Sequence, residues 1–245
     1  MRKTINIPTE LCQWALQNRR VPLLKIYLYL QFNYSGKVRL GKGEFKDICQ
    51  ALGYKSAKQP TKHFMTLLEL NWIGFNPKSG YHFIRGIDTI RSIEGFKRQT
   101  AIKMEHKDIF HLREFCFSVV LENLNNKQKQ RKRSQTVIAN RGSKNSNKIT
   151  NQTGTSSTLF KPISNDVIST LLGFTKSYSS TVKKKCVELG YIQVRHNFIE
   201  YKASIKGLDT KIARQYITNL RYINGKHYLQ QPDLIKTSLN IKKRK

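Results

Sequence analysis

The chain is poor in acidic residues and has no long apolar run. Of its 245 residues, 15 are Asp or Glu and 45 are Lys or Arg, so the formal net charge is +30. No stretch of about 18 apolar residues occurs, which predicts no transmembrane helix. Residues 1–8 lack the apolar core of a signal peptide. We therefore expect a cytoplasmic protein with no membrane-spanning segment.

Signatures of enzymes and metal sites are also missing. The four cysteines lie far apart and at least three fall in apolar helical patterns, which favours buried, reduced thiols over zinc ligands. Residues 41–43, Gly-Lys-Gly, lack the spacing of a phosphate-binding P-loop. No H-E-x-x-H motif or acid pair suggests a metal for strand cleavage, and none of the 11 tyrosines is singled out as a nucleophile. We expect no catalytic residue, metal or cofactor.

The excess of positive charge predicts an anionic partner. A field of this sign attracts polyanions and speeds encounters with them. DNA, RNA and an anionic membrane surface all have the required charge. Composition alone does not separate them.

One sequence module occurs twice. The first copy reads Leu-Gly-Tyr at 52–54, then a basic helical stretch, then Glu-Leu-Asn-Trp-Ile at 69–73. The second reads Leu-Gly-Phe at 172–174, a basic helical stretch, then Glu-Leu-Gly-Tyr-Ile at 188–192. A helical pattern precedes each copy, and two short apolar runs around a turn follow it. This is the order of elements in a winged helix-turn-helix.

The fold class that this repeat predicts is α+β, mainly α with small β-hairpin wings. In the first module we predict helices over 23–32, 43–52 and 58–70, and a hairpin of 72–75 and 81–84. Trp72, Phe75, Tyr81 and Phe83 in this hairpin are interpreted as core residues rather than a platform for stacking bases. A strand is expected over 100–104.

For the second module we predict a long helix over 106–128 and a short helix capped by Ser164, with Val167 facing inward. A helix over 177–189 follows, with Tyr178 and Leu189 facing the core. A hairpin is expected to turn at 196–197, before a last helix over 209–222. The predicted domains are a first winged helix (1–104), the first helix of the second module (105–124), a disordered basic segment (125–158), the rest of the second winged helix (159–230) and a basic tail (231–245).

The candidate DNA contacts lie mainly on the third helix of each module, because a helix fits the major groove and its N-terminal residues meet base edges and phosphates. In the first module they are Lys55, Ser56, Lys58, Thr61 and Lys62. In the second they are Thr175, Lys176, Ser177, Ser180, Lys183 and Lys184. For any single lysine the alternative is a solvated charge. His63 is interpreted as a packed residue at the core edge.

Further candidates lie in the wings and in the basic segment. Lys78, His82, Arg195 and His196 could reach the DNA backbone or minor groove, or belong to ordinary exposed hairpin tips. Arg131, Lys132 and Arg133 are candidates for phosphate contacts, with a solvated spacer as the alternative.

Two winged-helix modules joined by a basic segment resemble the initiators of plasmid replication that carry tandem winged-helix domains. The Leu-Gly-aromatic turn, the basic third helix and the wing carry this resemblance. It implies that the modules read successive major grooves of double-stranded DNA at repeated origin sites, and that one module also mediates homodimerisation.

The expected function is therefore sequence-selective DNA binding in the replication of a plasmid or other mobile element, alongside the replication machinery. One alternative is a transcriptional regulator acting on the transcription machinery. Another is a nonspecific nucleic-acid or RNA-binding protein.

Overall fold

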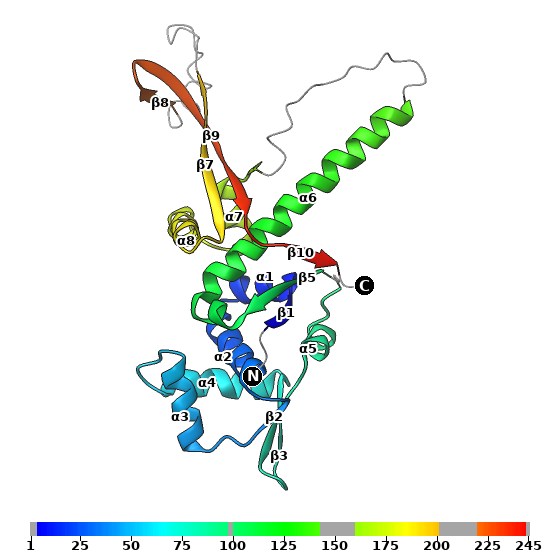
Figure 1. Ribbon diagram of the computed structural model, residues 1–245, viewed down its shortest axis with the longest axis vertical. Coiled ribbons are helices and arrows are strands. Elements are labelled where there is room, and N and C mark those ends of the chain that lie inside the picture. Colours follow the sequence, from blue (N-terminus) through cyan, green and yellow to red (C-terminus); the bar gives the residue numbers. More distant parts are fainter. Residues whose placement is uncertain (1–3, 98–99, 143–159, 201–219, 244–245) are drawn as a thin grey trace. The chain divides into compact units, whose positions relative to one another are not determined.

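The computed structural model describes residues 4–97, 100–142, 160–200 and 220–243 (Figure 1). The fold is mixed α+β, as predicted. The chain divides into two compact units. Unit 1 comprises Met1–Lys127 with Leu239–Lys245, and unit 2 comprises Gln128–Ser238.

Unit 1 contains two small sheets and most of the helices. Its elements in chain order are β1 (Thr4–Pro8), α1 (Thr9–Gln17), α2 (Val21–Asn33), β2 (Lys37–Val38), α3 (Lys42–Ala51), α4 (Lys58–Glu69), β3 (Ile73–Asn76), β4 (Tyr81–Ile84), α5 (Ile87–Ile93), β5 (Thr100–Glu105), the 3-10 helix η1 (His106–His111), the first half of α6 (Leu112–Gly142) and β10 (Ile241–Lys243). The strand orders are β1-β5-β10 and β2-β4-β3.

The core of unit 1 is built around α2. This helix is apolar on nearly every side, so it can be stable only when other elements surround it. It packs against α4, η1 and α1. Trp72 is fully buried beside it, with its ring centroid 5.2 Å from that of Tyr27. Both tryptophans of the chain, Trp14 and Trp72, lie in this unit, with their ring centroids separated by 5.3 Å.

Unit 2 has a similar arrangement of strands and helices. Its elements are β6 (Lys161–Pro162), α7 (Asn165–Leu172), α8 (Lys176–Glu188), β7 (Ile192–Glu200), β8 (Leu220–Ile223) and β9 (Lys226–Thr237), with the C-terminal half of α6. The strand order β6-β9-β7 matches β2-β4-β3, since in both sheets the central strand lies between the strand that follows the basic helix and the short strand that precedes the helices. Strand β8 pairs with the N-terminal end of β9.

The two copies also agree in backbone conformation. Gly53 and Gly173, which follow α3 and α7, have φ values of 78° and 65°. At the ends of α4 and α8, Asn71 and Gly190 have φ values of 57° and 74°. The next residue in each copy then donates a 2.9 Å hydrogen bond back to the helix, from Trp72 to Leu67 and from Tyr191 to Cys186. The repeat seen in the sequence is therefore present in the structure.

This conformation gives a stability prediction for Gly190. A Cβ at Gly190 would meet no atom within 4 Å, so the only cost of Gly190→Ala is the left-handed backbone. That cost is about 1–2 kcal/mol. Gly190→Asn should cost less, because asparagine tolerates this region and already occupies it at Asn71. Urea unfolding followed by circular dichroism measures both, and equal losses would contradict the explanation.

Helix α6 is longer than the sequence pattern predicts. The pattern places its end near Gln128 and predicts disorder over 125–158, whereas the helix continues to Gly142. Lys, Arg and Gln are good helix formers, and no Gly or Pro occurs between Leu112 and Gly142 to interrupt the helix. The rest of that predicted segment, residues 143–158, lies outside the described residues. Residues 105–124 belong to unit 1 rather than to the second module, because η1 packs on α2 and β5, and Phe115 and Phe117 are buried.

The hairpin of unit 2 also differs from its prediction. Strand β7 passes through 196–197 with a register shift instead of turning there. A tight turn at Asn224 and Gly225 joins β8 to β9, and both residues have positive φ (49° and 79°), as a two-residue hairpin of this type requires. Residues 220–222, expected at the end of a helix, are in β8, and 209–219 lie outside the described residues. Residues 231–237 continue β9 and 241–243 form β10, so these parts of the predicted basic tail are strands.

Three side chains predicted to face the core of unit 2 are substantially exposed. Val167 is 51% exposed, and Tyr178 and Leu189 are each 37% exposed. The buried faces are narrower than predicted. In α7 only Ile168 and Leu172, separated by one helical turn, are buried.

Candidate nucleic-acid interface

Helix α4 exposes the basic face that the sequence predicts. Pro60, Phe64 and Leu67 form its buried stripe, and the helix packs against α2. All five predicted contact residues are exposed, namely Lys55, Ser56, Lys58, Thr61 and Lys62. The one acidic residue of the helix is Glu69, at its C-terminal end. The N-terminal half of α4 is therefore a positively charged surface.

Helix α8 exposes a similar but smaller set. Thr175, Lys176, Ser177 and Lys184 are exposed and Ser180 is half-buried. The Thr175 hydroxyl caps the helix by accepting a 3.2 Å hydrogen bond from the Tyr178 amide. Lys176 lies 2.8 Å from the Asp166 carboxylate, but both side chains are well exposed, and such pairs contribute little and exchange readily for other partners. Lys185, which the sequence pattern does not single out, is also exposed.

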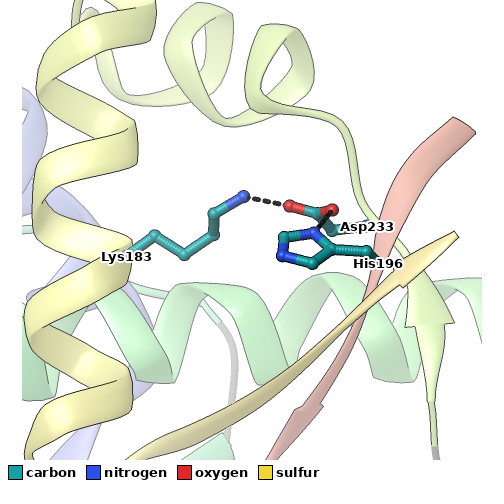
Figure 2. Close-up of polar contacts among 3 residues, drawn as sticks. All are labelled: Lys183, His196 and Asp233. Atoms are coloured by element: carbon teal, nitrogen blue, oxygen red, sulfur yellow. Dashed lines mark hydrogen bonds and ion pairs between the residues drawn. The ribbon is translucent and has the colours of Figure 1, made fainter. Parts of the chain in front are cut away.

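Lys183 is not a surface charge. It is 8% exposed and occupies the position in α8 that Phe64 occupies in α4. Its ammonium donates a 2.6 Å hydrogen bond to Oδ2 of Asp233 in β9. Oδ1 of the same carboxylate lies 3.0 Å from Nδ1 of His196 in β7 (Figure 2). A buried ammonium requires such a partner, so Lys183, a predicted DNA contact, instead links α8 to the strands, while His196 contacts the same carboxylate from an exposed position.

The carboxylate at the centre of this group is held in its charged form. Burial acts first to raise the pKa of Asp233, but hydrogen bonds and charge from Lys183 and His196 outweigh that effect and leave the pKa below its ordinary value. The His196 side chain is 69% exposed, whereas those of Lys183 and Asp233 are 10% and 13% exposed. The buried Lys183–Asp233 pair is therefore the main structural contact, and His196 adds to it from the solvent side.

The remaining hairpin residues have different environments. Lys78 is exposed in the turn between β3 and β4. His82 packs between Phe64 and Phe75, with ring centroids 5.3 and 4.8 Å away, so it is a half-buried side chain and not an exposed hairpin tip. Arg195 is exposed and its guanidinium lies 4.2 Å from the centroid of the Phe160 ring.

Several other predicted residues lie near these surfaces. His63 is half-buried, which agrees with a position at the core edge. Phe75 and Phe83, predicted in the core, are 53% and 43% exposed, whereas Trp72 is fully buried as predicted. Arg131, Lys132 and Arg133 lie within α6, and their side chains are not among those that the structure describes. All four cysteines are buried free thiols, as predicted.

The environment of His82 and His63 predicts that acid destabilises unit 1. Burial lowers the pKa of His82, and burial followed by the charges of Arg20 and Lys62 lowers that of His63. Below the ordinary value of about 6.5 the unfolded chain takes up protons that the folded chain resists, so stability is lost as pH falls from there.

His82→Phe should reduce this loss of stability. Urea unfolding followed by tryptophan fluorescence reports on unit 1 alone, because it contains both tryptophans. An unchanged dependence on pH in His82→Phe would show that other groups cause it.

Comparison with known proteins adds no relative, because no family model, curated protein or solved structure matches the chain. Among the described helices, none is long and apolar enough to cross a membrane. Within the same described residues, no three His, Cys, Asp or Glu side chains gather where they could hold a metal ion. Function is therefore inferred from the structural repeat and its exposed basic surfaces.

Proposed function

We propose that the chain binds double-stranded DNA sequence-selectively through two winged helix-turn-helix modules, without catalysis of its own. The observation that carries this proposal is the structural repeat. Each unit has the same strand order, and in each an exposed basic helix directly precedes the hairpin. In a winged helix this third helix enters the major groove, and the hairpin lies against the adjacent backbone.

The charge distribution supports phosphate contacts at both helices. Acidic residues occur in α4 and α8 only at the C-terminal ends, as Glu69 and Glu188. The exposed lysines and hydroxyls lie nearer the N-termini, where unpaired amide groups and the helix dipole also favour anions. Lysines neutralise phosphates, and serine and threonine hydroxyls can bind phosphates or base edges.

The biological role that we favour is replication initiation on a plasmid or another mobile element. Tandem winged helices on a strongly basic chain support it, through their resemblance to initiators. A transcriptional regulator would use the same contacts, and the two roles differ in where the bound sites lie.

Selection of binding sites from random duplex DNA at about 150 mM salt tests the proposal, because specific contacts survive at this ionic strength better than purely electrostatic ones. An enriched motif, above all a repeated or two-site motif, is the expected result. Its position at an origin or beside a promoter then separates initiator from regulator. Retention of DNA without enrichment would instead indicate a nonspecific nucleic-acid-binding protein.

A further inference from the structure

The β2-β4-β3 sheet has an outer face that the proposed duplex site does not use. Residues directly opposite each other on neighbouring strands share a face of the sheet. Phe83 lies opposite both Lys37 and Gly74, and Tyr81 lies opposite Asn76. We call these five residues the outer face. The other face carries Ile73, Ile84 and the His82–Phe75 pair, and it meets α4 through Phe64.

Phe83 is exposed because of the residue beside it. A side chain at Gly74 would begin 4.0 Å from the Cβ of Phe83, but glycine leaves this space empty. The Phe83 side chain is accordingly 43% exposed. Tyr81, two residues before it on the same strand, is half-buried. Two aromatic rings therefore follow each other along one side of β4, with a backbone separation of about 7 Å.

Basic groups surround these rings. The Lys37 ammonium lies 5.6 Å from the centroid of the Tyr81 ring, and the Arg39 guanidinium carbon lies 5.3 Å from it. Arg39 is held there by a 3.2 Å hydrogen bond to the Ser79 carbonyl. None of the residues in β2, β3 and β4 is acidic. The face thus combines aromatic surface with positive charge.

We propose that this outer face binds single-stranded nucleic acid, with bases stacked on Phe83 and Tyr81 and phosphates bound by Lys37 and Arg39. A single strand can spread its bases and present their flat sides, which a duplex keeps stacked on each other. The spacing of the two rings suits bases separated in this way. Single-strand binding at this face does not use α4 or α8. The candidate duplex contact of this hairpin, Lys78, lies in the turn between β3 and β4 and not on the outer face.

The test compares three ligands for the full-length chain by fluorescence anisotropy. They are a labelled oligo-dT of about 12 nucleotides, long enough for several stacked bases, an abasic strand with the same number of phosphates, and a duplex. The wild-type chain should bind oligo-dT more tightly than the abasic strand. Phe83→Ala should weaken oligo-dT binding about tenfold and leave the other two ligands within about twofold, because stacking on a single aromatic ring is lost.

Phe75→Ala is the matched control. Phe75 belongs to the same hairpin and is more exposed than Phe83, at 53%, but it lies on the opposite face. Its replacement should leave oligo-dT binding unchanged. Phe83→Leu provides a second variant that keeps apolar volume and removes only the ring, and it should behave like Phe83→Ala even where the alanine variant folds poorly.

Several results would overturn the proposal. The first is equal affinity of the wild-type chain for oligo-dT and the abasic strand, and the second is an equal loss in the Phe83 and Phe75 variants. A third is that Phe83→Leu changes the mass of the particle in solution, measured by light scattering, while its oligo-dT binding is unaltered. That result would show that a second copy of the chain covers the face. Duplex binding in the same experiment tests the proposed function separately.

Discussion

Replacing Asp233 with alanine is expected to destabilise unit 2 by about 3 kcal/mol, since removing one partner of a buried ion pair leaves an uncompensated charge. The charge left behind is the ammonium of Lys183, whose side chain is 10% exposed. Asp233 also holds His196, so α8 and both strands of the hairpin would lose their common contact. Few single substitutions in this unit should cost more.

A double replacement separates the pair from other effects of the substitution. Lys183→Met with Asp233→Ala should recover most of the stability, because apolar residues often replace a buried ion pair at little cost. Phe64 shows that an apolar residue is already used at this position in the other copy. Asp166→Ala is the matched control. Its pair with Lys176 has a similar length, 2.8 Å, but is exposed, so it should cost less than about 0.5 kcal/mol.

Two spectroscopic signals assign the effect to its unit. Circular dichroism in urea follows both units, whereas tryptophan fluorescence follows unit 1, which contains Trp14 and Trp72. Asp233→Ala should shift the transition seen by circular dichroism to lower urea and leave the fluorescence transition in place. A loss no larger than that of Asp166→Ala would show that the pair contributes no more than a surface contact.

The pH dependence of this contribution follows from the lowered pKa of Asp233. A carboxyl whose pKa is lower in the folded state stabilises the fold above its ordinary pKa, about 3.9, and loses this effect as pH falls further. The Lys183–Asp233 contribution is therefore complete at neutral pH. It differs in this respect from the histidine effect in unit 1, which begins near the ordinary histidine pKa of about 6.5.

The sequence predicts the first module closely because its signals are local. Helices expected over 43–52 and 58–70 are found at Lys42–Ala51 and Lys58–Glu69. Periodic apolar residues and a terminal glycine or asparagine determine such elements within a few residues of each other. The exception, α5, has seven residues with only Ile90 buried, too few to form a periodic pattern.

The second module is harder to predict because its partners are distant in the sequence. Residue type alone places Lys183 on the surface, and the acid that neutralises it lies 50 residues away. Alignment of the repeat, which places Lys183 on Phe64, is the signal that points to a buried position. The Asn224-Gly225 turn is a local hairpin signal, and it joins β8 to β9. The length of β7 has no local signal, since β9 determines it.

Replacing both Lys58 and Lys62 with alanine is expected to weaken duplex binding by at least about tenfold and to reduce the slope of log K against log salt by about two units. Each phosphate contact releases a counterion and contributes about 0.9 to that slope. Both lysines are exposed near the N-terminus of α4, and neither belongs to its buried stripe. Their removal should therefore change binding without changing the fold.

Lys97→Ala with Lys103→Ala is the matched control for this prediction. Both residues are exposed lysines of unit 1 outside α4 and its hairpin, so the change in net charge is identical. If α4 is the contact surface, the control should shift the salt slope by less than about half a unit. Equal losses in the two double variants would mean that the net charge of +30, and no particular helix, holds the DNA. Specific recognition by α4 would then have to be abandoned.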